Sequence, residues 1–417
     1  MKIIELKKED FDNFTMSHKY TNPWQTSAFG DAYLSMGYGV FYLGVEDGHS
    51  IVAASMIIYK YDYLGFKSAY APRGIIIDYD NATLLEKALS EIKKFMFRQK
   101  VMSLTIDPMI VSKYTTKEDV LIEENKYADT IINNLKEFNF EQLGQNFGFE
   151  GIMPKFNAVI TLPIDSQETF RKISKQARNK LRKAVKYGVE IYKDEALDYE
   201  ALNNIMIDKY KHKPEYYKAV CESLKDKCEV FYARLNTEKY VSNSKLLYEK
   251  EIENNNYLNS IIQFNSYKGK NMRAVLNKKM ESDKVLAAYK GHLVDATDLL
   301  RDYPEGLNIA ATIVVTINNT AYIVEDNYKK AYKLIPSLPL LRWKLIENYS
   351  SKGHKIINLG PISGNIKNGE NNYKGLNEAK YNFKALSASL IGEFTMITNK
   401  AMYSLYLRSS NYEKFDI

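Results

Sequence analysis

Cysteine is scarce in this sequence, and the side chains that usually bind metals are scattered. Among 417 residues there are two cysteines, Cys221 and Cys228, whose spacing fits neither a zinc site nor a thioredoxin-type motif. The five histidines include no pair at the spacing that places two imidazoles on one helix face. We therefore expect reduced thiols in a cytoplasmic protein, and no bound metal.

Long apolar segments are missing as well. The longest run, residues 309–317, is far shorter than the roughly 18 to 20 residues of a membrane-spanning helix and contains Thr312 and Thr316. We interpret it as a buried strand. Residues 1–12 mix charged and apolar side chains, so they do not have the uninterrupted apolar stretch of a secretory signal.

Loops that bind nucleotides or carry a nucleophile are also absent. The sequence has no Walker loop, no Gly-x-Gly-x-x-Gly fingerprint and no Gly-x-Ser-x-Gly elbow, which disfavours NTPases, dinucleotide-binding enzymes and serine hydrolases. It also lacks the glycine-rich loop with which N-acetyltransferases hold the pyrophosphate of CoA. We expect no cofactor, and an acyl-CoA donor is disfavoured.

The composition that remains is that of a folded protein of two domains. Hydrophobic residues make up 45% of the chain and charged residues 26%, and the length exceeds that of one ordinary core. The net charge of +7 is unevenly distributed, which favours an anionic partner such as RNA, a nucleotide sugar or an anionic membrane.

One pattern of strands and a helix occurs twice. Strands at residues 40–45 and 51–59 flank an Asp-Gly turn and precede a helix at 84–100 and a strand at 102–106. The same order follows at 310–317, 321–325, 340–350 and 355–359. We therefore expect two related α/β units, each a mixed sheet with helices. This arrangement resembles the fold of the N-acetyltransferase superfamily in duplicate, which implies two N-acetyltransferase-like domains.

A polar, proline-free segment at residues 238–302 separates the repeats. Its narrow apolar stripe and the break at residues 265–269 predict an antiparallel two-helix coiled-coil arm, although a helical insertion packed on the body remains open. The first predicted domain comprises residues 1–155, completed by 384–417. The second comprises residues 156–237 and 303–383.

A strongly basic helix is predicted at residues 169–189. Asp165 or Ser166 can cap its start and Gly188 fits its end. This segment contains eight cations and no acid: Arg171, Lys172, Lys175, Arg178, Lys180, Arg182, Lys183 and Lys186. A solvated charged face is one interpretation, but such faces usually mix both signs, so we favour an anionic ligand such as RNA or phosphate.

Several short motifs together resemble the Fem family of peptidyltransferases. The basic segment from Ile173 to Val189 is similar to the basic helix of that family, and further matches follow its order along nearly the whole chain. These matches are Ala71-Pro72-Arg73-Gly74, Thr105-Ile106-Asp107-Pro108, Leu340-Leu341-Arg342-Trp343, Ile362-Ser363-Gly364 and Gly375-Leu376-Asn377-Glu378-Ala379-Lys380.

The resemblance implies an aminoacyl-tRNA-dependent peptidyltransferase. Such enzymes move an amino acid (here Gly, Ala or Ser) from its tRNA to the stem or bridge peptide of lipid II or UDP-MurNAc-pentapeptide. The resemblance does not decide whether the chain also contacts the inner face of the membrane, other Fem-type transferases or a second copy of itself. Two alternatives are a Fem-like transferase acting on another amine and a non-catalytic RNA-binding protein on the same fold.

The resemblance also predicts residue roles. Lys380 matches the family lysine that stabilises charge at the tRNA end, with a plain surface lysine as the alternative. Asp107 matches an aspartate near the acceptor that could take the amine proton, with a turn-capping aspartate as the alternative. Arg73 is predicted to bind phosphate or carboxylate. The predicted tRNA-binding residues are Lys175, Arg178, Lys180, Arg182, Lys183 and Phe383.

The sequence departs from the family pattern around the predicted substrate. Tyr33 stands where many members carry a diphosphate-binding lysine, and the segment from His212 and Lys213 to Tyr217 replaces an Arg-x-x-x-Tyr motif. Ala379 replaces a phenylalanine that stacks on the terminal adenine, which leaves Phe383 or Tyr381 for that role. Tyr373 completes the predicted substrate-binding set.

Overall fold

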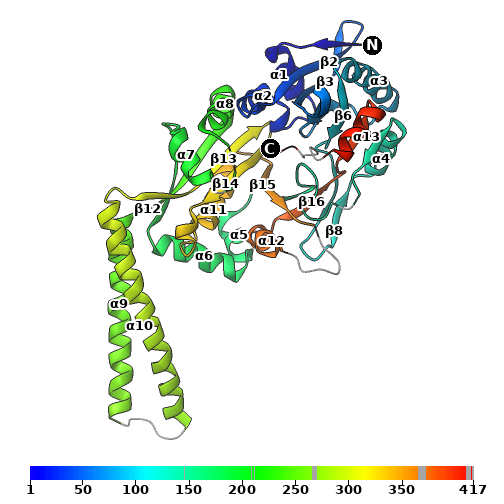
Figure 1. The fold of residues 1–417 in the computed structure, drawn as a ribbon. Helices are drawn as coiled ribbons and strands as arrows, with labels where there is room; N and C mark the ends of the chain where they lie inside the picture. The colour runs from blue at the N-terminus through cyan, green and yellow to red at the C-terminus, as the bar shows by residue number, and fades with distance from the viewer. Residues whose placement is uncertain are drawn as a thin grey trace.

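Two mixed β-sheets and a projecting pair of helices make up the computed structural model (Figure 1). It describes residues 1–144, 146–207, 209–210, 212–264, 270–364, 372–409 and 415. The two-sheet α/β architecture with its arm confirms the predicted fold class.

The first sheet has the order β1-β2-β3-β4-β6-β17-β9, with β5 paired to β3. Its strands are β1 (Lys2–Glu5), β2 (Gly39–Asp47), β3 (Ser50–Tyr61), β4 (Lys67–Ala71), β5 (Ile76–Ile77), β6 (Val101–Ile106), β9 (Phe140–Gln142) and β17 (Phe394–Ile397). The predicted Asp-Gly hairpin is confirmed, because β2 and β3 are antiparallel and Gly48 adopts a φ of +65° at their turn.

The second sheet has the order β11-β12-β13-β14-β15-β10-β16-β7-β8. Its strands are β7 (Val111–Thr115), β8 (Leu121–Glu124), β10 (Phe156–Thr161), β11 (Val189–Lys193), β12 (Cys228–Leu235), β13 (Leu307–Ile317), β14 (Thr320–Tyr328), β15 (Ile356–Ile362) and β16 (Leu386–Leu390). The apolar run at 309–317 lies in β13, buried as predicted.

The strands do not follow the predicted domain boundaries. β7 and β8 come from the segment assigned to the first domain, and β16 from the segment expected to complete it, yet all three lie in the second sheet. β16 joins them because it pairs with β10 on one side and with β7 on the other. Within the described part of residues 384–417, β17 and the helix α13 (Lys400–Arg408) return to the first sheet.

Helices cover both sheets and also join them. Around the first sheet lie α1 (Lys8–Ser17), α2 (Ser27–Ser35), α3 (Ala82–Arg98) and α4 (Ala128–Glu137). Associated with the second are α5 (Ser166–Lys172), α6 (Lys175–Lys186), α7 (Tyr199–Met206), α8 (Pro214–Leu224), α11 (Ser337–Ser351) and α12 (Lys374–Tyr381). One apolar core belongs to each sheet, and a third contains residues of α1, α2, α7 and α8 and so connects the two halves.

The basic segment forms two helices instead of the one that was predicted. Ile173 is extended (ψ 158°) and ends α5, and the Ser174 hydroxyl accepts a hydrogen bond from Ala177 N (3.0 Å) to begin α6. The predicted ends are confirmed: the Asp165 carboxylate accepts from Glu168 N (2.8 Å), and Gly188, with a φ of +80°, follows α6.

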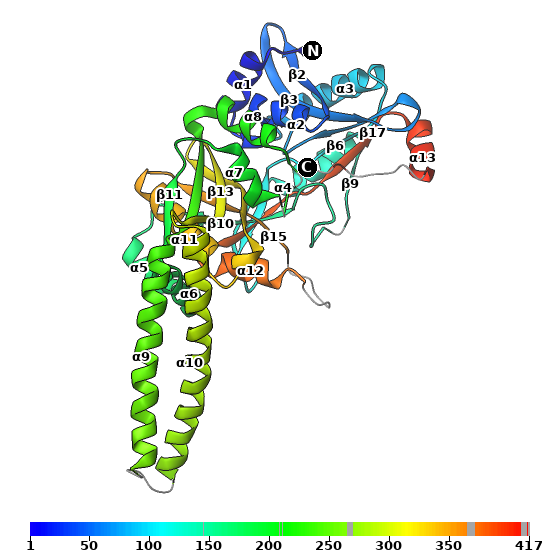
Figure 2. The ribbon, with the colours of Figure 1, turned by 60° about the vertical axis from the view of Figure 1, so that its left-hand side comes forward.

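The arm consists of α9 (Thr237–Gln263) and α10 (Lys270–Asp302), which pack along each other and project from the body (Figures 1 and 2). The projecting arm is thus confirmed over the packed insertion, while the predicted break at 265–269 lies outside the described residues. Asn255 is buried in the seam and donates to Ser282 Oγ (3.1 Å) and Asp283 Oδ1 (2.9 Å). A buried polar pair of this kind fixes the register of two helices.

We predict that the outer arm is dispensable for the stability of the body. Only the base of the arm enters the main core, through residues such as Tyr240 and Ala296. Replacing residues 249–288 with a short Gly/Ser linker should change the melting temperature of the body by less than about 4 °C, the shift that roughly 1 kcal/mol produces in a domain of this size. Calorimetry would test this, and a large loss of melting temperature would contradict it.

Candidate functional site

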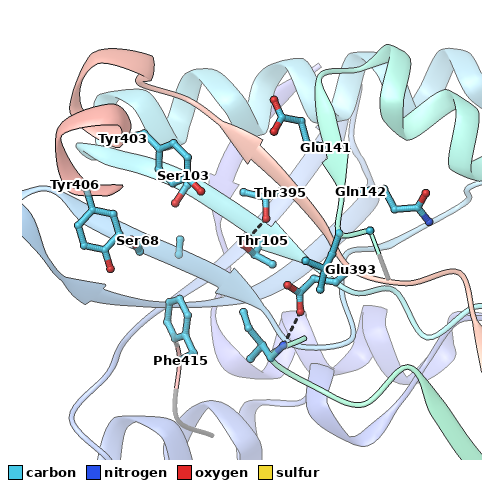
Figure 3. Close-up of a pocket in the computed structure, with 14 residues that line it drawn as sticks. Ser68, Ser103, Thr105, Glu141, Gln142, Glu393, Thr395, Tyr403, Tyr406 and Phe415 are labelled. Atoms are coloured by element: carbon cyan, nitrogen blue, oxygen red, sulfur yellow. Dashed lines mark hydrogen bonds between the residues drawn. The ribbon is translucent and has the colours of Figure 1, made fainter. Parts of the chain in front are cut away.

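A polar groove lies on one face of the first sheet (Figure 3). Along β4, β6 and β17 the side chains alternate, so that Ala69, Leu104 and Phe394 face the apolar core. Their neighbours Ser68, Ser103, Thr105 and Thr395 line a cavity of about 310 Å³ on the opposite face. Ser68 pairs with Ser103 and Thr105 with Thr395, which makes the hydroxyl groups one continuous strip.

The other walls of the groove carry acids and aromatic rings. Tyr403 and Tyr406 come from α13, Glu141 from β9, and Glu393 from the residue before β17. The Glu393 carboxylate accepts a hydrogen bond from Ile152 N (2.6 Å), which fixes one of its oxygens (Figure 3). A groove with hydroxyls, carboxylates and rings is suited to a polar ligand that bears an ammonium group.

Arg73 and Asp107 form a buried ion pair just beyond the strip of hydroxyls. Asp107 follows β6 two residues after Thr105, and its Oδ2 lies 3.0 Å from Arg73 Nη1. Arg73 N donates to Asp107 Oδ1 (2.7 Å), and Arg73 Nη2 donates to the carbonyl of Pro154 (2.8 Å). Burial raises the pKa of Asp107, and the positive charge of Arg73 opposes that shift.

This geometry fits the turn-capping alternative for Asp107, because the carboxylate holds the backbone at Arg73, where φ is +53°. Its role as a proton acceptor stays a prediction.

Tyr33, His212 and Tyr217 come together where the two halves of the molecule meet. His212 Nδ1 lies 3.2 Å from Glu325 Oε1, and its ring stacks on Tyr216 at 3.8 Å. Tyr33 packs edge to face against Tyr216. Burial raises the pKa of Tyr33, and the negative charges of Asp107 and Glu325 raise it further. The tyrosine therefore lies near carboxylates from both halves of the molecule.

Lys380 is buried in the second domain, which overturns the surface-lysine alternative. Its side chain lies at the end of α12, it is 2% exposed, and Nζ donates to the carbonyl of Pro361 (2.7 Å). Burial lowers the pKa of Lys380, as does the nearby charge of Arg342, while Asp326 opposes the shift. A positive charge here is therefore costly unless an anion binds beside it.

Asp326 holds the cations around Lys380. Its Oδ2 accepts from Nε (2.9 Å) and Nη2 (2.6 Å) of Arg342, and Lys209 Nζ lies 3.1 Å from Oδ1. Burial would raise the pKa of Asp326, but the charges of Arg342, Lys209 and Lys380 outweigh it and lower the pKa well below its usual range.

The cations of α6 are largely free of acidic partners. Within the described part of the chain, no α6 lysine or arginine forms an ion pair, and Lys175, Arg182 and Lys183 are exposed. Arg178 differs, because its Nη1 donates to the carbonyls of Arg171 and Ile173 (both 2.6 Å) and so caps α5. The unpaired charge supports the predicted anionic ligand, with Arg178 in a structural position.

Three further predicted residues have the following positions. Lys213 is exposed at the start of α8, and Tyr373 packs against Phe149 at 4.6 Å. Phe383 is 2% exposed and stacks on Trp343 (6.4 Å) inside the core, so its predicted stacking on a base is not supported by this placement.

Sequence reasoning assigned no role to Glu325, Asp326 or Glu393. Glu325 and Asp326 adjoin the end of a predicted strand, a signal that could have found them. Glu393 is brought to the groove only by the pairing of β17 with β6.

The described residues contain no cluster of three or more His, Cys, Asp or Glu side chains that could hold a metal ion. Among the helices in the described ranges, none has the length and apolar character needed to cross a membrane.

Comparison with known proteins matches this arrangement to one family. The model of the FemAB family covers residues 6–408. The chain belongs to the FemAB family. Aminoacyltransferase FemA of Staphylococcus epidermidis is 22% identical over 415 residues, covering 97% of this chain and 98% of its own. FemA of Staphylococcus aureus strain N315 is also 22% identical and covers 97% of each chain.

The fold is shared with a solved structure as well. The crystal structure of FemX superposes with a TM-score of 0.69 at 16% identity and covers 97% of this chain and 99% of its own. The family resemblance drawn from the motifs is thereby confirmed, and the similarity extends over the arm as well as both sheets.

We predict that the pair of Arg342 and Asp326 is a major contributor to stability near neutral pH. Arg342→Met leaves a buried carboxylate poorly compensated and should lower the free energy of unfolding by about 3 kcal/mol. Because the folded pKa of Asp326 is depressed, this stabilisation is present above the unfolded pKa of about 4 and is lost as the pH falls below it.

Chemical denaturation at pH 7 and below pH 4 would measure the effect. Lys344→Met on the same helix is the control, because Lys344 forms only a surface pair with Glu347 and should change stability by less than about 0.5 kcal/mol. Equal effects of the two substitutions would disprove the assignment.

Proposed function

We propose that this FemAB-family aminoacyltransferase moves an amino acid from aminoacyl-tRNA to an amine of a peptidoglycan precursor, in the stem or bridge peptide of lipid II or UDP-MurNAc-pentapeptide. The acceptor amine attacks the ester carbonyl, a C–N bond forms, and the C–O bond to the tRNA ribose breaks. The proton lost by the amine ends on the ribose oxygen. An already activated ester requires no covalent nucleophile, so positioning and charge stabilisation are sufficient.

The buried amine of Lys380 supports the proposal that the donor is an aminoacyl-tRNA. It is oriented by the Pro361 carbonyl, and its pKa is lowered by burial and by the nearby charge of Arg342. A phosphate or developing oxyanion beside Lys380 would favour its charged form and be stabilised by it. The exposed cations of α6, on the same half of the molecule, supply further contacts for a polyanion such as tRNA.

The groove on the first sheet supports the proposal that the acceptor is an amine of a peptide. Its hydroxyl strip can bind peptide groups, and Glu141 and Glu393 can attract the ammonium form of an acceptor amine. Arg73 and Asp107 follow at its end, near Tyr33. With Tyr33 buried among aromatic rings and Arg73 paired with Asp107, a diphosphate would have to bind another cation, which keeps a different acceptor as the second candidate.

We predict that Lys380→Met reduces transfer at least about 100-fold, the loss typical of removing one charge-stabilising donor. Transfer of radiolabelled Gly, Ala or Ser from charged tRNA to lipid II and to UDP-MurNAc-pentapeptide would measure it. Lys374→Met is the matched control, because Lys374 is exposed on the same helix and should retain activity. Turnover unchanged in Lys380→Met would refute the role, and tRNA binding without transfer to either acceptor would refute the proposed reaction.

We also predict that α6 binds the tRNA backbone. Replacing Lys175 and Lys183 with glutamine should lower the slope of log affinity against log salt concentration by about 2, since each phosphate contact contributes close to 1. Filter binding across a salt series would measure this. A pair of exposed lysines elsewhere, Lys87→Gln with Lys126→Gln, is the control and should leave the slope unchanged. An unaltered slope in the α6 variant would exclude these contacts.

A further inference from the structure

Large apolar side chains are exposed at one end of the first sheet. Isolated exposed apolar residues are ordinary, but a group of them in one place indicates a binding surface. The residues and their exposed fractions are Tyr61 (69%), Leu64 (71%), Phe97 (58%), Leu405 (47%) and Leu407 (50%).

Backbone pairing brings the three segments that carry these side chains to one place. Tyr61 pairs with Lys67 across the β3–β4 hairpin, and Lys67 pairs in turn with Val101 at the start of β6. Phe97 lies in the last turn of α3, just before β6, and Lys67 N donates to the carbonyl of Lys100 (2.9 Å).

The third segment, α13, begins at the same strand. The residue before its cap, Thr398, donates its backbone N–H to the carbonyl of Met102 (3.0 Å). Figure 2 shows the loop between β3 and β4 beside α13 at one edge of the molecule.

The same segments are rich in cations and poor in acids. They carry Lys67, Arg98, Lys100, Lys400 and Arg408, for which no acidic partner is found in the described part of the chain. Residues 97–100 and 400–408 contain no acid. The one acid of residues 60–67, Asp62, has a 7% exposed side chain 3.7 Å from Lys60.

One of these lysines, Lys67, also lies directly against aromatic rings. Lys67 Nζ is 4.5 Å from the ring centre of Tyr59 and 5.3 Å from that of Tyr61. Burial lowers the pKa of Lys67, and the charge of Lys100 adds to the effect, so positive charges lie close together here. We call these five apolar residues and five cations the basic apolar end.

We propose that the basic apolar end docks on an anionic lipid bilayer. Leucine and aromatic side chains at a hairpin tip and at helix surfaces can enter the boundary between head groups and acyl chains, while lysine and arginine contact lipid phosphates. A set of cations whose segments contain one acid, the largely buried Asp62, matches such a surface better than the mixed charges of a typical protein interface. Docking of this kind needs no membrane-spanning helix.

The proposed surface adjoins the groove without including its lining. Tyr403 and Tyr406 of α13 line the groove, whereas Leu405 and Leu407 of the same helix are exposed. A bilayer bound at this end would therefore place lipid-linked molecules close to the groove. The docking itself does not depend on the proposed transfer reaction.

Co-sedimentation with vesicles tests the proposal. The full-length chain should partition at least about tenfold more strongly onto vesicles of equal parts phosphatidylglycerol and phosphatidylcholine than onto phosphatidylcholine alone, because each cation near an anionic surface strengthens binding several-fold. Leu64→Glu combined with Phe97→Glu should reduce that partitioning at least about tenfold. Both side chains are more than half exposed, so the substitutions should leave folding intact.

The matched control is Leu121→Glu combined with Ile122→Glu, on edge strand β8 of the second sheet, where exposure is 52% and 54%. This control should bind anionic vesicles like the unaltered chain. Failure of the unaltered chain to bind, an equal loss in both variants, or full binding by Leu64→Glu/Phe97→Glu would overturn the proposal in favour of another partner, such as an acidic protein. Transfer to the water-soluble acceptor UDP-MurNAc-pentapeptide, measured in parallel, tests the proposed reaction independently of vesicle binding.

Discussion

A single buried carboxylate, Asp326, lies among basic side chains from three separate parts of the chain. Arg342 on α11 binds it through two nitrogens, Lys209 reaches it from the segment after α7, and Lys380 approaches from α12. Without that negative charge, the charges of Arg342 and Lys209 would be uncompensated in a region of low dielectric constant, and the charged form of Lys380 would be less favourable still. The position of Lys380, and with it the proposed donor site, depends on this cluster.

The second constraint is the aromatic core between the two halves of the molecule. It joins α2 of the first half to α8 of the second, and it encloses Tyr33, Tyr217 and the pair of His212 and Glu325. Because Arg73 also binds the Pro154 carbonyl, just before β10, the ion pair with Asp107 is tied to the start of a strand of the second sheet. The groove and the Lys380 cluster are thus parts of one connected body.

The surroundings of Tyr33 and His212 show what these two departures from the family pattern mean for the site. Tyr33 does not take over the role of a surface cation, because it is 2% exposed and packed against other rings. His212 is partnered by Glu325, which leaves it less able to hold a phosphate than a free arginine fork. Neither side chain therefore replaces the lysine or the arginine of the family pattern.

The sequence by itself determined the local elements, because their signals depend on neighbouring residues. The Asp-Gly hairpin, the caps at Asp165 and Gly188, the buried strand at 309–317 and the two-helix arm all follow from spacing and turn chemistry. The family resemblance was readable for the same reason, since each motif is a short run in a fixed order.

Tertiary structure alone decided which distant segments meet. Strand pairing between residues far apart in the chain places β7, β8 and β16 in the second sheet and forms the strip of hydroxyls from Ser68 to Thr395. Packing between distant residues likewise buries Phe383. Even the break at Ile173 depends on context, because Arg178 and Asn382 complete the backbone hydrogen bonds there. Local periodicity carries no information about such pairings, which are selected by the burial of apolar surface across the whole fold.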